Sequence, residues 1–346
     1  MDPDSIDAVE RVPHGGTTDF DVLDLSANIN PRTPPGVSSV YAQALEDARR
    51  YPDDEFPDFR AAAASYVGCQ AHNVVPTPGG LAAIRLVLEC RLDPGDTVLV
   101  PAPSFGEYAR EVRLQGATPT FYPHDGVAGI ETKTLERASV VIVCRPNNPT
   151  GELPEKGALE ALIDRCSRTD TMVLVDEAFL GFTGEPSLAT DGYSHVVVAR
   201  SLTKLFGLPG IRAGFAVAFG PFADRLERAR RAWTLGTPAA AVGAHCMRDE
   251  AFVRATRTRT DAERTRLVDA LEGVRRYSVF PSDSPFILLE LPDGDAVDGL
   301  LECARAANVV FRDARTFRRL DAHVRIAVRD EGATNRTLEV LTHADE

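Results

Sequence analysis

The chain has 346 residues, a net charge of −13 and a hydrophobic content of 44%. These values are typical of a globular protein of about two domains, and the acidic charge argues against nucleic acid as a partner. The sequence contains no run of about 18 apolar residues, so we predict no membrane span. Residues 1–5 lack the apolar core of a secretory signal. The six cysteines contain no C-x-x-C pair, so we expect no metal site, no disulfide framework and a cytoplasmic location.

Short β-branched runs alternate with helical patterns through the first two thirds of the chain. The runs, continuously apolar as in parallel strands buried on both faces, lie at 97–100, 139–144, 172–175 and 195–199. Helical patterns alternate with them, at 81–92, before the first run, and at 155–168, between the second and the third. The sequence therefore predicts an α/β fold in which helices flank a mostly parallel central sheet.

The pattern changes past about residue 222. Charged helical stretches at 222–234 and 250–271 are followed by short strands at 286–290 and 323–328. This pattern is typical of a second, smaller α+β domain. The predicted divisions are an N-terminal arm, a large domain and a small domain, at residues 1–35, 36–234 and 235–346.

Lys204 is the first candidate catalytic residue. The chain contains 35 arginines but three lysines, and Lys204 lies in a stretch rich in Ser, Thr and Gly. An arginine stays charged at any working pH and cannot form a Schiff base, whereas a lysine with a lowered pKa can. A lysine in a loop is usually a solvent-exposed residue without a catalytic role. The assignment of Lys204 therefore depends on the residues around it.

Polar residues follow two of the predicted strands, and ligands of open parallel sheets bind at such strand ends. Asn148 lies in the loop after the strand at 139–144, and Asp176 ends the strand at 172–175. A carboxylate in that position needs a cationic partner, such as a protonated pyridine nitrogen. Each pattern also fits a turn or a helix cap.

An anion site is predicted where Gly79 and Gly80 precede a helix, because amides at a helix N-terminus bind phosphate. Ser201, Thr203 and Arg212 surround the lysine and offer further anion ligands. A glycine pair at a helix start is common and carries little weight alone.

In this order and spacing, the motifs resemble the fold-type I pyridoxal 5'-phosphate enzymes of aminotransferase class I/II, from residue 25 to about 341. The resemblance implies that Lys204 holds the cofactor aldehyde and that Asp176 pairs with the pyridine nitrogen, which makes the ring an electron sink. It also implies a hydrogen bond from Asn148 to the 3'-oxygen and stacking of Phe105 on the ring. The implied phosphate ligands are Gly80, Leu81, Ser201, Arg212 and, from the neighbouring subunit of a homodimer, Tyr51.

Two departures from the family pattern stand out. Phe179 replaces the usual tyrosine, which removes a phenol from the 3'-oxygen. Residues 80–83, Gly-Leu-Ala-Ala, lack the Ser, Thr or Glu that relatives often have there, so backbone amides would carry more of the phosphate binding.

The arm at 24–31 and the segment at 310–329 resemble the threonine-phosphate decarboxylases of cobalamin synthesis. That reaction would convert L-threonine O-3-phosphate to 1-aminopropan-2-yl phosphate. Such an enzyme must bind a phosphate and orient a carboxylate, whereas histidinol phosphate carries one phosphate and no carboxylate. The implied substrate ligands are Arg312, Arg325 and Arg329, whose guanidinium groups suit both anions, together with Asn28 of the arm.

Two alternatives stay open at this level. The nearer is an aminotransferase for histidinol phosphate or a related amino acid, which needs an amino acceptor. The other is a non-enzymatic regulator, which would carry a DNA-binding domain before the arm. The arginines could also form surface salt bridges.

Overall fold

The computed structural model describes residues 1–343. Its large sheet has seven strands in the order β2-β8-β7-β6-β5-β3-β4. Only β8 runs antiparallel to its neighbours, so the predicted mostly parallel sheet is confirmed. The strands are β2 (Val74–Thr77), β3 (Thr97–Ala102), β4 (Thr118–Pro123), β5 (Val140–Cys144), β6 (Met172–Asp176), β7 (Val196–Ser201) and β8 (Gly214–Val217).

Helices cover both faces of this sheet, which explains the continuously apolar strands. In β5, Val141 and Val143 pack into one core cluster, while Val140 and Ile142 pack into the cluster on the opposite face. The helices of this part are α2 (Val37–Asp47), α3 (Pro57–Val67), α4 (Gly80–Arg91), α5 (Glu107–Leu114), α6 (Thr132–Leu135), α7 (Lys156–Ser167), α8 (Pro221–Ala229) and α9 (Thr237–Arg248).

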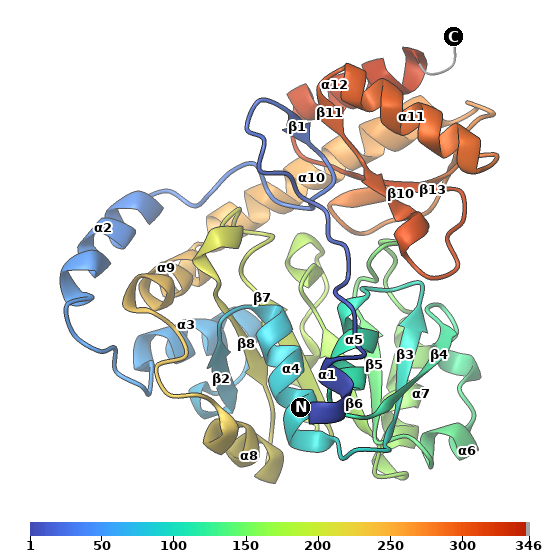
Figure 1. Cartoon of the computed structure of the whole chain (residues 1–346). Coiled ribbons are helices and arrows are strands. Elements are labelled where there is room, and N and C mark those ends of the chain that lie inside the picture. The colour runs from blue at the N-terminus through green and yellow to red at the C-terminus, as the bar shows by residue number, and fades with distance from the viewer. Residues whose placement is uncertain (344–346) are drawn as a thin grey trace.

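A second sheet, antiparallel and smaller, has the strand order β12-β13-β10-β9, and β1 and β11 form a separate parallel pair. Figure 1 shows this part, in orange and red, above the large sheet, with α10 (Glu250–Leu271) running toward it. Its other elements are β9 (Ser278–Val279), β10 (Phe286–Glu290), α11 (Gly294–Ala306), β11 (Val309–Val310), β12 (Arg312–Asp313), β13 (His323–Ala327) and α12 (Glu331–His343).

The N-terminal segment connects the two parts (Figure 1). Strand β1 (Leu23–Asp24) lies beside the small sheet, where Leu25 N–H donates to the Val310 carbonyl at 2.8 Å. Toward the N-terminus the chain descends to α1 (Pro3–Ile6), which contacts α5. Toward the C-terminus, Asn30 N–H donates to the Lys204 carbonyl at 3.0 Å. The arm therefore lies along the space between the two sheets.

Two details differ from the sequence prediction. The helix expected at 222–234 ends at Ala229, because Asp54 accepts hydrogen bonds from the Arg230 guanidinium at 3.0 Å and from Trp233 N–H at 2.6 Å. Helix α9 packs against α2 and α3 in the core of the large sheet. We therefore propose a domain boundary within α10 rather than at residue 235; the division stays a prediction. None of the described helices has the length and apolarity needed to cross a membrane.

Candidate active site

The ends of three neighbouring strands bring the predicted residues together. In the sheet register Asp176 lies between Cys144 of β5 and Ala199 of β7, so the loops after these strands meet at one edge. A cavity of about 350 Å³ opens there, between the large sheet, the small sheet and the arm. The predicted residues that line it are Asn28, Gly80, Leu81, Phe105, Asn148, Asp176, Ser201, Lys204, Arg212, Arg312 and Arg325.

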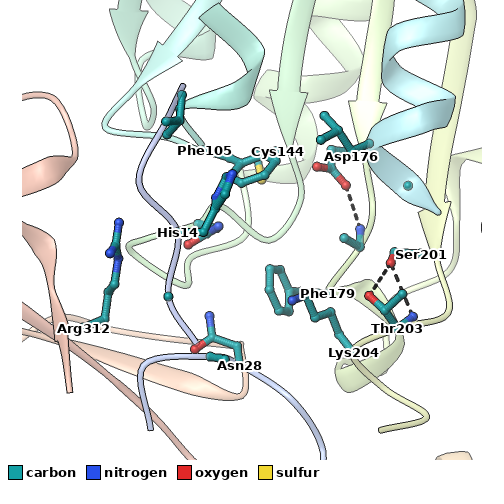
Figure 2. A pocket seen from close by; sticks show the side chains of 18 of the residues that line it. His14, Asn28, Phe105, Cys144, Asp176, Phe179, Ser201, Thr203, Lys204 and Arg312 are labelled. Atoms are coloured by element: carbon teal, nitrogen blue, oxygen red, sulfur yellow. Dashed lines mark hydrogen bonds between the residues drawn. The ribbon is translucent and has the colours of Figure 1, made fainter. Parts of the chain in front are cut away.

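Lys204 points into this cavity from the loop after β7 (Figure 2). Burial lowers the pKa of its amine to about 8, and the charges of Arg325 and Arg212 act in the same direction. A neutral amine is the form that attacks a carbonyl carbon. Lys204 thus lies in the cavity with a lowered pKa, and its role as the reactive lysine stays a prediction.

Asp176 is buried at the end of β6, and burial raises the pKa of its carboxyl group. Two hydrogen bonds oppose this effect: the Tyr108 hydroxyl donates to Oδ2 at 2.6 Å and Ala178 N–H donates to Oδ1 at 2.9 Å. Among residues 1–343 the carboxylate forms no ion pair. It is thus prepared for a cationic group bound in the cavity.

The neighbouring carboxylate, Glu177, is balanced differently. It accepts hydrogen bonds from Arg145 at 3.3 Å, Arg200 at 3.0 Å and the Ser187 hydroxyl at 2.6 Å. All four groups are buried behind the strand ends. This network supports the loops that carry Asn148, Asp176 and Lys204.

A small anion cup lies at the start of α4. Gly79 has φ 103°, and a Cβ there would lie 2.8 Å from Arg212 Nη2. A Cβ on Gly80 would meet Ser201 Cβ at 3.0 Å, so both glycines let the chain approach the opposite wall closely. Arg212 forms no ion pair within the described residues, although its Nη1 donates to the Pro209 carbonyl at 3.0 Å. Free amides, a hydroxyl and an unpaired guanidinium suit a phosphate group.

Two arginines of the small sheet line the wall of the cavity that faces the large sheet. Arg312 of β12 and Arg325 of β13 are direct partners in the antiparallel register, and both line the cavity. Arg325 donates to Asn148 Oδ1 and, at 2.8 Å, to the Ser26 carbonyl, whereas Arg312 donates to the Pro13 carbonyl at 2.9 Å. Neither guanidinium forms an ion pair with a carboxylate in the part of the chain that the structure describes. Burial and the charge of Arg312 lower the pKa of Arg325.

Two predicted residues do not line the cavity. The Tyr51 side chain is 78% exposed and stacks on Trp233 at 4.5 Å between ring centroids. Arg329 follows the last residue of β13 by two positions, near Asp24 and Asp330. The cavity thus contains two of the three predicted substrate arginines.

His14 and Tyr108 are cavity residues that sequence reasoning missed. The His14 imidazole lies 2.9 Å from Glu107 Oε1 and 5.8 Å from the Phe105 ring (Figure 2). No local pattern in the sequence indicates His14; in the fold, Gly15 permits the close approach of this segment to the arm, since a Cβ there would lie 2.3 Å from the Ser26 carbonyl oxygen. Tyr108 lies three residues after Phe105, across the turn that begins α5, and its N–H donates to the Phe105 carbonyl at 3.1 Å.

The comparison with protein families matches residues 21–341 to the model described as aminotransferase class I and II. The chain belongs to this family. The family depends on pyridoxal 5'-phosphate, so the predicted cofactor is confirmed. The residues fit it: the anion cup suits its phosphate, and the buried carboxylate of Asp176 suits a pyridinium nitrogen.

The curated relatives divide between two reactions. The chain is 28% identical over 326 residues to histidinol-phosphate aminotransferase 2 of Archaeoglobus fulgidus, covering 93% of each protein. It is 32% identical over 316 residues to a Caldanaerobacter subterraneus subsp. tengcongensis protein provisionally named threonine-phosphate decarboxylase, covering 88% of this chain and 85% of that protein.

Solved structures show the same division. The L-threonine-O-3-phosphate decarboxylase of Porphyromonas gingivalis superposes with a TM-score of 0.84 at 23% identity, covering 94% of this chain and all of that one. The histidinol-phosphate aminotransferase of Clostridium acetobutylicum superposes with a TM-score of 0.85 at 24% identity, covering 94% and 99%. At these identities the likeness establishes the fold, which confirms the predicted fold-type I architecture.

Proposed function

We propose that this enzyme decarboxylates L-threonine O-3-phosphate to 1-aminopropan-2-yl phosphate. The observation that carries the proposal is the pairing of Arg312 with Arg325 across two strands, facing the cavity without a carboxylate. Like charges directly opposite each other in a sheet are unfavourable. An anionic substrate would offset this repulsion, and a substrate with two anionic groups would use both guanidinium groups.

The large-sheet wall would hold the cofactor. We assign its phosphate to the amides at Gly80 and Leu81 with Ser201 and Arg212, and its aldehyde carbon to Lys204. When bound, the cofactor supplies an electron sink for the electron pair that is left at the substrate's α-carbon. Further contacts would come from Asp176 at the ring nitrogen, Asn148 at the 3'-oxygen and Phe105 against the ring face.

The small-sheet wall would orient the substrate. Arg325 is the deeper cation and donates to Asn148, so we assign the substrate carboxylate to it. Arg312 and His14 lie on the side of the cavity away from Ser201, and we assign the substrate phosphate to them (Figure 2). Asn28 Oδ1 is buried without a hydrogen-bond partner and would accept from the substrate amine.

Reaction choice would depend on how Arg325 orients the substrate carboxylate. A carboxylate that Arg325 holds in the reactive orientation would leave as carbon dioxide. Lys204, freed by the incoming substrate and protonated to the ammonium form, would then deliver a proton from Nζ to the α-carbon and return to the neutral amine. In the cofactor-free protein its pKa of about 8 already lies closer to neutral pH than that of an ordinary lysine.

A second candidate is a histidinol-phosphate aminotransferase. The Archaeoglobus relative favours it, since the match spans 93% of both chains. An amino acceptor such as 2-oxoglutarate also carries carboxylates, which the Arg325 guanidinium could bind. The two reactions therefore share one site, and the chemistry must separate them.

The test is to incubate the enzyme, loaded with cofactor, with threonine phosphate alone and with histidinol phosphate plus 2-oxoglutarate. We expect carbon dioxide and 1-aminopropan-2-yl phosphate from the first mixture, and no dependence on 2-oxoglutarate. Glutamate formation in the second mixture, without carbon dioxide in the first, would favour the aminotransferase. A Lys204→Ala variant controls for reaction of free cofactor.

We also propose a homodimer in which Tyr51 reaches the cofactor phosphate of the partner. The Tyr51–Trp233 stack supports this because it is an exposed aromatic pair, with Trp233 N–H donating to Asp54 at 2.6 Å. Mixing a Tyr51→Ala variant with a Lys204→Ala variant would restore one intact site per mixed dimer. No recovery of activity would argue against a shared site.

A further inference from the structure

Tyr108, on α5, is a buried residue of the cavity wall to which the proposed mechanism assigns no role. Its side chain has no exposed surface, yet it carries a polar hydroxyl. A buried phenol needs a hydrogen-bond partner, and the choice of partner is therefore informative.

The Tyr108 hydroxyl donates to Asp176 Oδ2 at 2.6 Å. Burial and the charge of Asp176 raise the pKa of the phenol well above its usual value, so the phenol keeps its proton and acts as the donor. Ala178 N–H reaches the other carboxylate oxygen at 2.9 Å. Each oxygen of Asp176 thus has one donor from the protein, and its remaining acceptor directions are free for a group in the cavity.

The ring of the same tyrosine contacts Phe105. The two rings meet edge to face, with centroids 5.5 Å apart and planes at 87°. Tyr108 N–H also donates to the Phe105 carbonyl at 3.1 Å. One side chain therefore supports both the proposed charge partner of the cofactor and the residue proposed to stack on it.

We propose that Tyr108 is a positioning residue that keeps Asp176 ionised and directed at the cofactor's ring nitrogen while its ring fixes Phe105. This inference rests on the proposed assignment of Asp176. A buried carboxyl group favours the protonated form, and a hydrogen bond from a neutral donor favours the carboxylate. Without the phenol, the balance moves toward a neutral acid, which pairs poorly with a pyridinium.

Tyr108→Phe removes only the hydroxyl, and Tyr122→Phe is a matched control. Tyr122 is also buried and donates at 2.6 Å to the Ile142 carbonyl, but it lies outside the cavity. Each variant is loaded with pyridoxal 5'-phosphate labelled with ¹⁵N at the ring. The measurements are the ¹⁵N chemical shift, the cofactor Kd and, with the substrate that the wild type turns over, kcat and KM.

For Tyr108→Phe we expect a ring-nitrogen shift toward the neutral pyridine value, cofactor binding about tenfold weaker and kcat lowered by about tenfold, with KM little changed. Tyr122→Phe should keep the wild-type ¹⁵N chemical shift and cofactor Kd, even if it unfolds at a lower urea concentration. Tyr108→His keeps an N–H donor on a ring, so its ¹⁵N chemical shift should lie between those of Tyr108→Phe and the wild type. This variant also replaces Tyr108→Phe in the test if the phenylalanine variant folds poorly.

A wild-type nitrogen shift in Tyr108→Phe would overturn the inference. An Asp176→Asn variant separates this result from failure of the underlying assignment. If Asp176→Asn moves the nitrogen shift and Tyr108→Phe does not, Tyr108 has no such role. If neither variant moves it, Asp176 does not pair with the ring nitrogen.

Discussion

Arginines lie on both sides of the cavity, Arg145 and Arg200 behind the strand ends of the large sheet and Arg312 and Arg325 on the small-sheet wall, but their charges are balanced differently. On the large-sheet side, Arg145 and Arg200 pair with Glu177 at 3.3 and 3.0 Å. On the small-sheet side, Arg312 and Arg325 lie opposite each other and donate to carbonyl, amide or hydroxyl oxygens.

This difference in charge pairing indicates which arginines support the fold and which are available for a ligand. A buried pair that is neutralised internally holds loops in place and is costly to break, because the surviving charge is left without a partner. Buried cations without an acid leave their neutralisation to a ligand. The structure thus distinguishes arginines that are neutralised by a carboxylate within the fold from those that face the cavity without one, and we propose that the latter bind the substrate.

The largest expected effect is the loss of turnover when Lys204 of the large-sheet wall is removed while the substrate-binding arginines of the small-sheet wall remain. Lys204→Ala should lower turnover by on the order of 10⁴-fold or more, because it removes the amine that we assign to the cofactor aldehyde and to proton transfer. Binding of threonine phosphate, measured by calorimetry, should persist, since Arg312 and Arg325 remain. Lys156→Ala, which changes an exposed lysine on α7, is the control. Turnover that survives in Lys204→Ala would contradict the assignment of the lysine.

The next prediction tests the charge balance directly. Arg200→Met should lower the free energy of unfolding by about 3 kcal/mol, because Glu177 loses a buried partner. Arg325→Met should change it by about 1 kcal/mol or less, since the loss of two hydrogen bonds is offset by relief of a buried, unpaired charge. Urea unfolding of the cofactor-free proteins measures both. Equal losses would remove the distinction between the two walls.

A smaller effect concerns which arginines bind substrate. Arg312→Ala should raise KM by about tenfold to a hundredfold, because it removes a charge-assisted hydrogen bond. Arg329→Ala should change KM by less than about threefold, since Arg329 does not line the cavity. Steady-state kinetics on the same substrate compares them. A larger effect at Arg329 would show that the cavity reorganises when substrate binds.

The smallest effect is the pH dependence of Lys204 in the cofactor-free protein. Its pKa of about 8 lies below the ordinary lysine value of 10.5, so the folded state loses this proton first. Between pH 8 and 10.5 the unfolded state binds more protons, and stability relative to a Lys204→Met variant should rise with pH. NMR of dimethylated lysines, assigned with Lys204→Arg, gives the midpoint. A midpoint near 10.5 would mean that neither burial nor the charges of Arg325 and Arg212 lower the pKa of the lysine.

The sequence predicted the large-sheet wall well because its residues follow buried strands. A strand that is apolar throughout must end where polar residues begin, and parallel strands end at a common edge. Asn148, Asp176 and Lys204 were therefore identified with few assumptions about packing, and all three line the cavity.

The small-sheet wall was predicted less completely. Arg325 and Arg329 would share one face of a strand that continued through both, since side chains alternate. Strand β13 ends at Ala327, before Arg329 is reached. His14 enters the cavity from a segment far away in the chain, and no local pattern encodes that approach.

The sequence by itself predicted the fold class, because the hydrophobic period and the strand ends are local properties. Its resemblance to a known family indicated the cofactor and gave Lys204 as the candidate catalytic lysine. The tertiary structure decided which charges are paired. Arg145, Arg200, Arg312 and Arg325 look alike in the sequence, but only chain folding places Glu177 beside the first two and leaves the last two facing the cavity. Pairing depends on contacts between distant segments, and the sequence does not record distances.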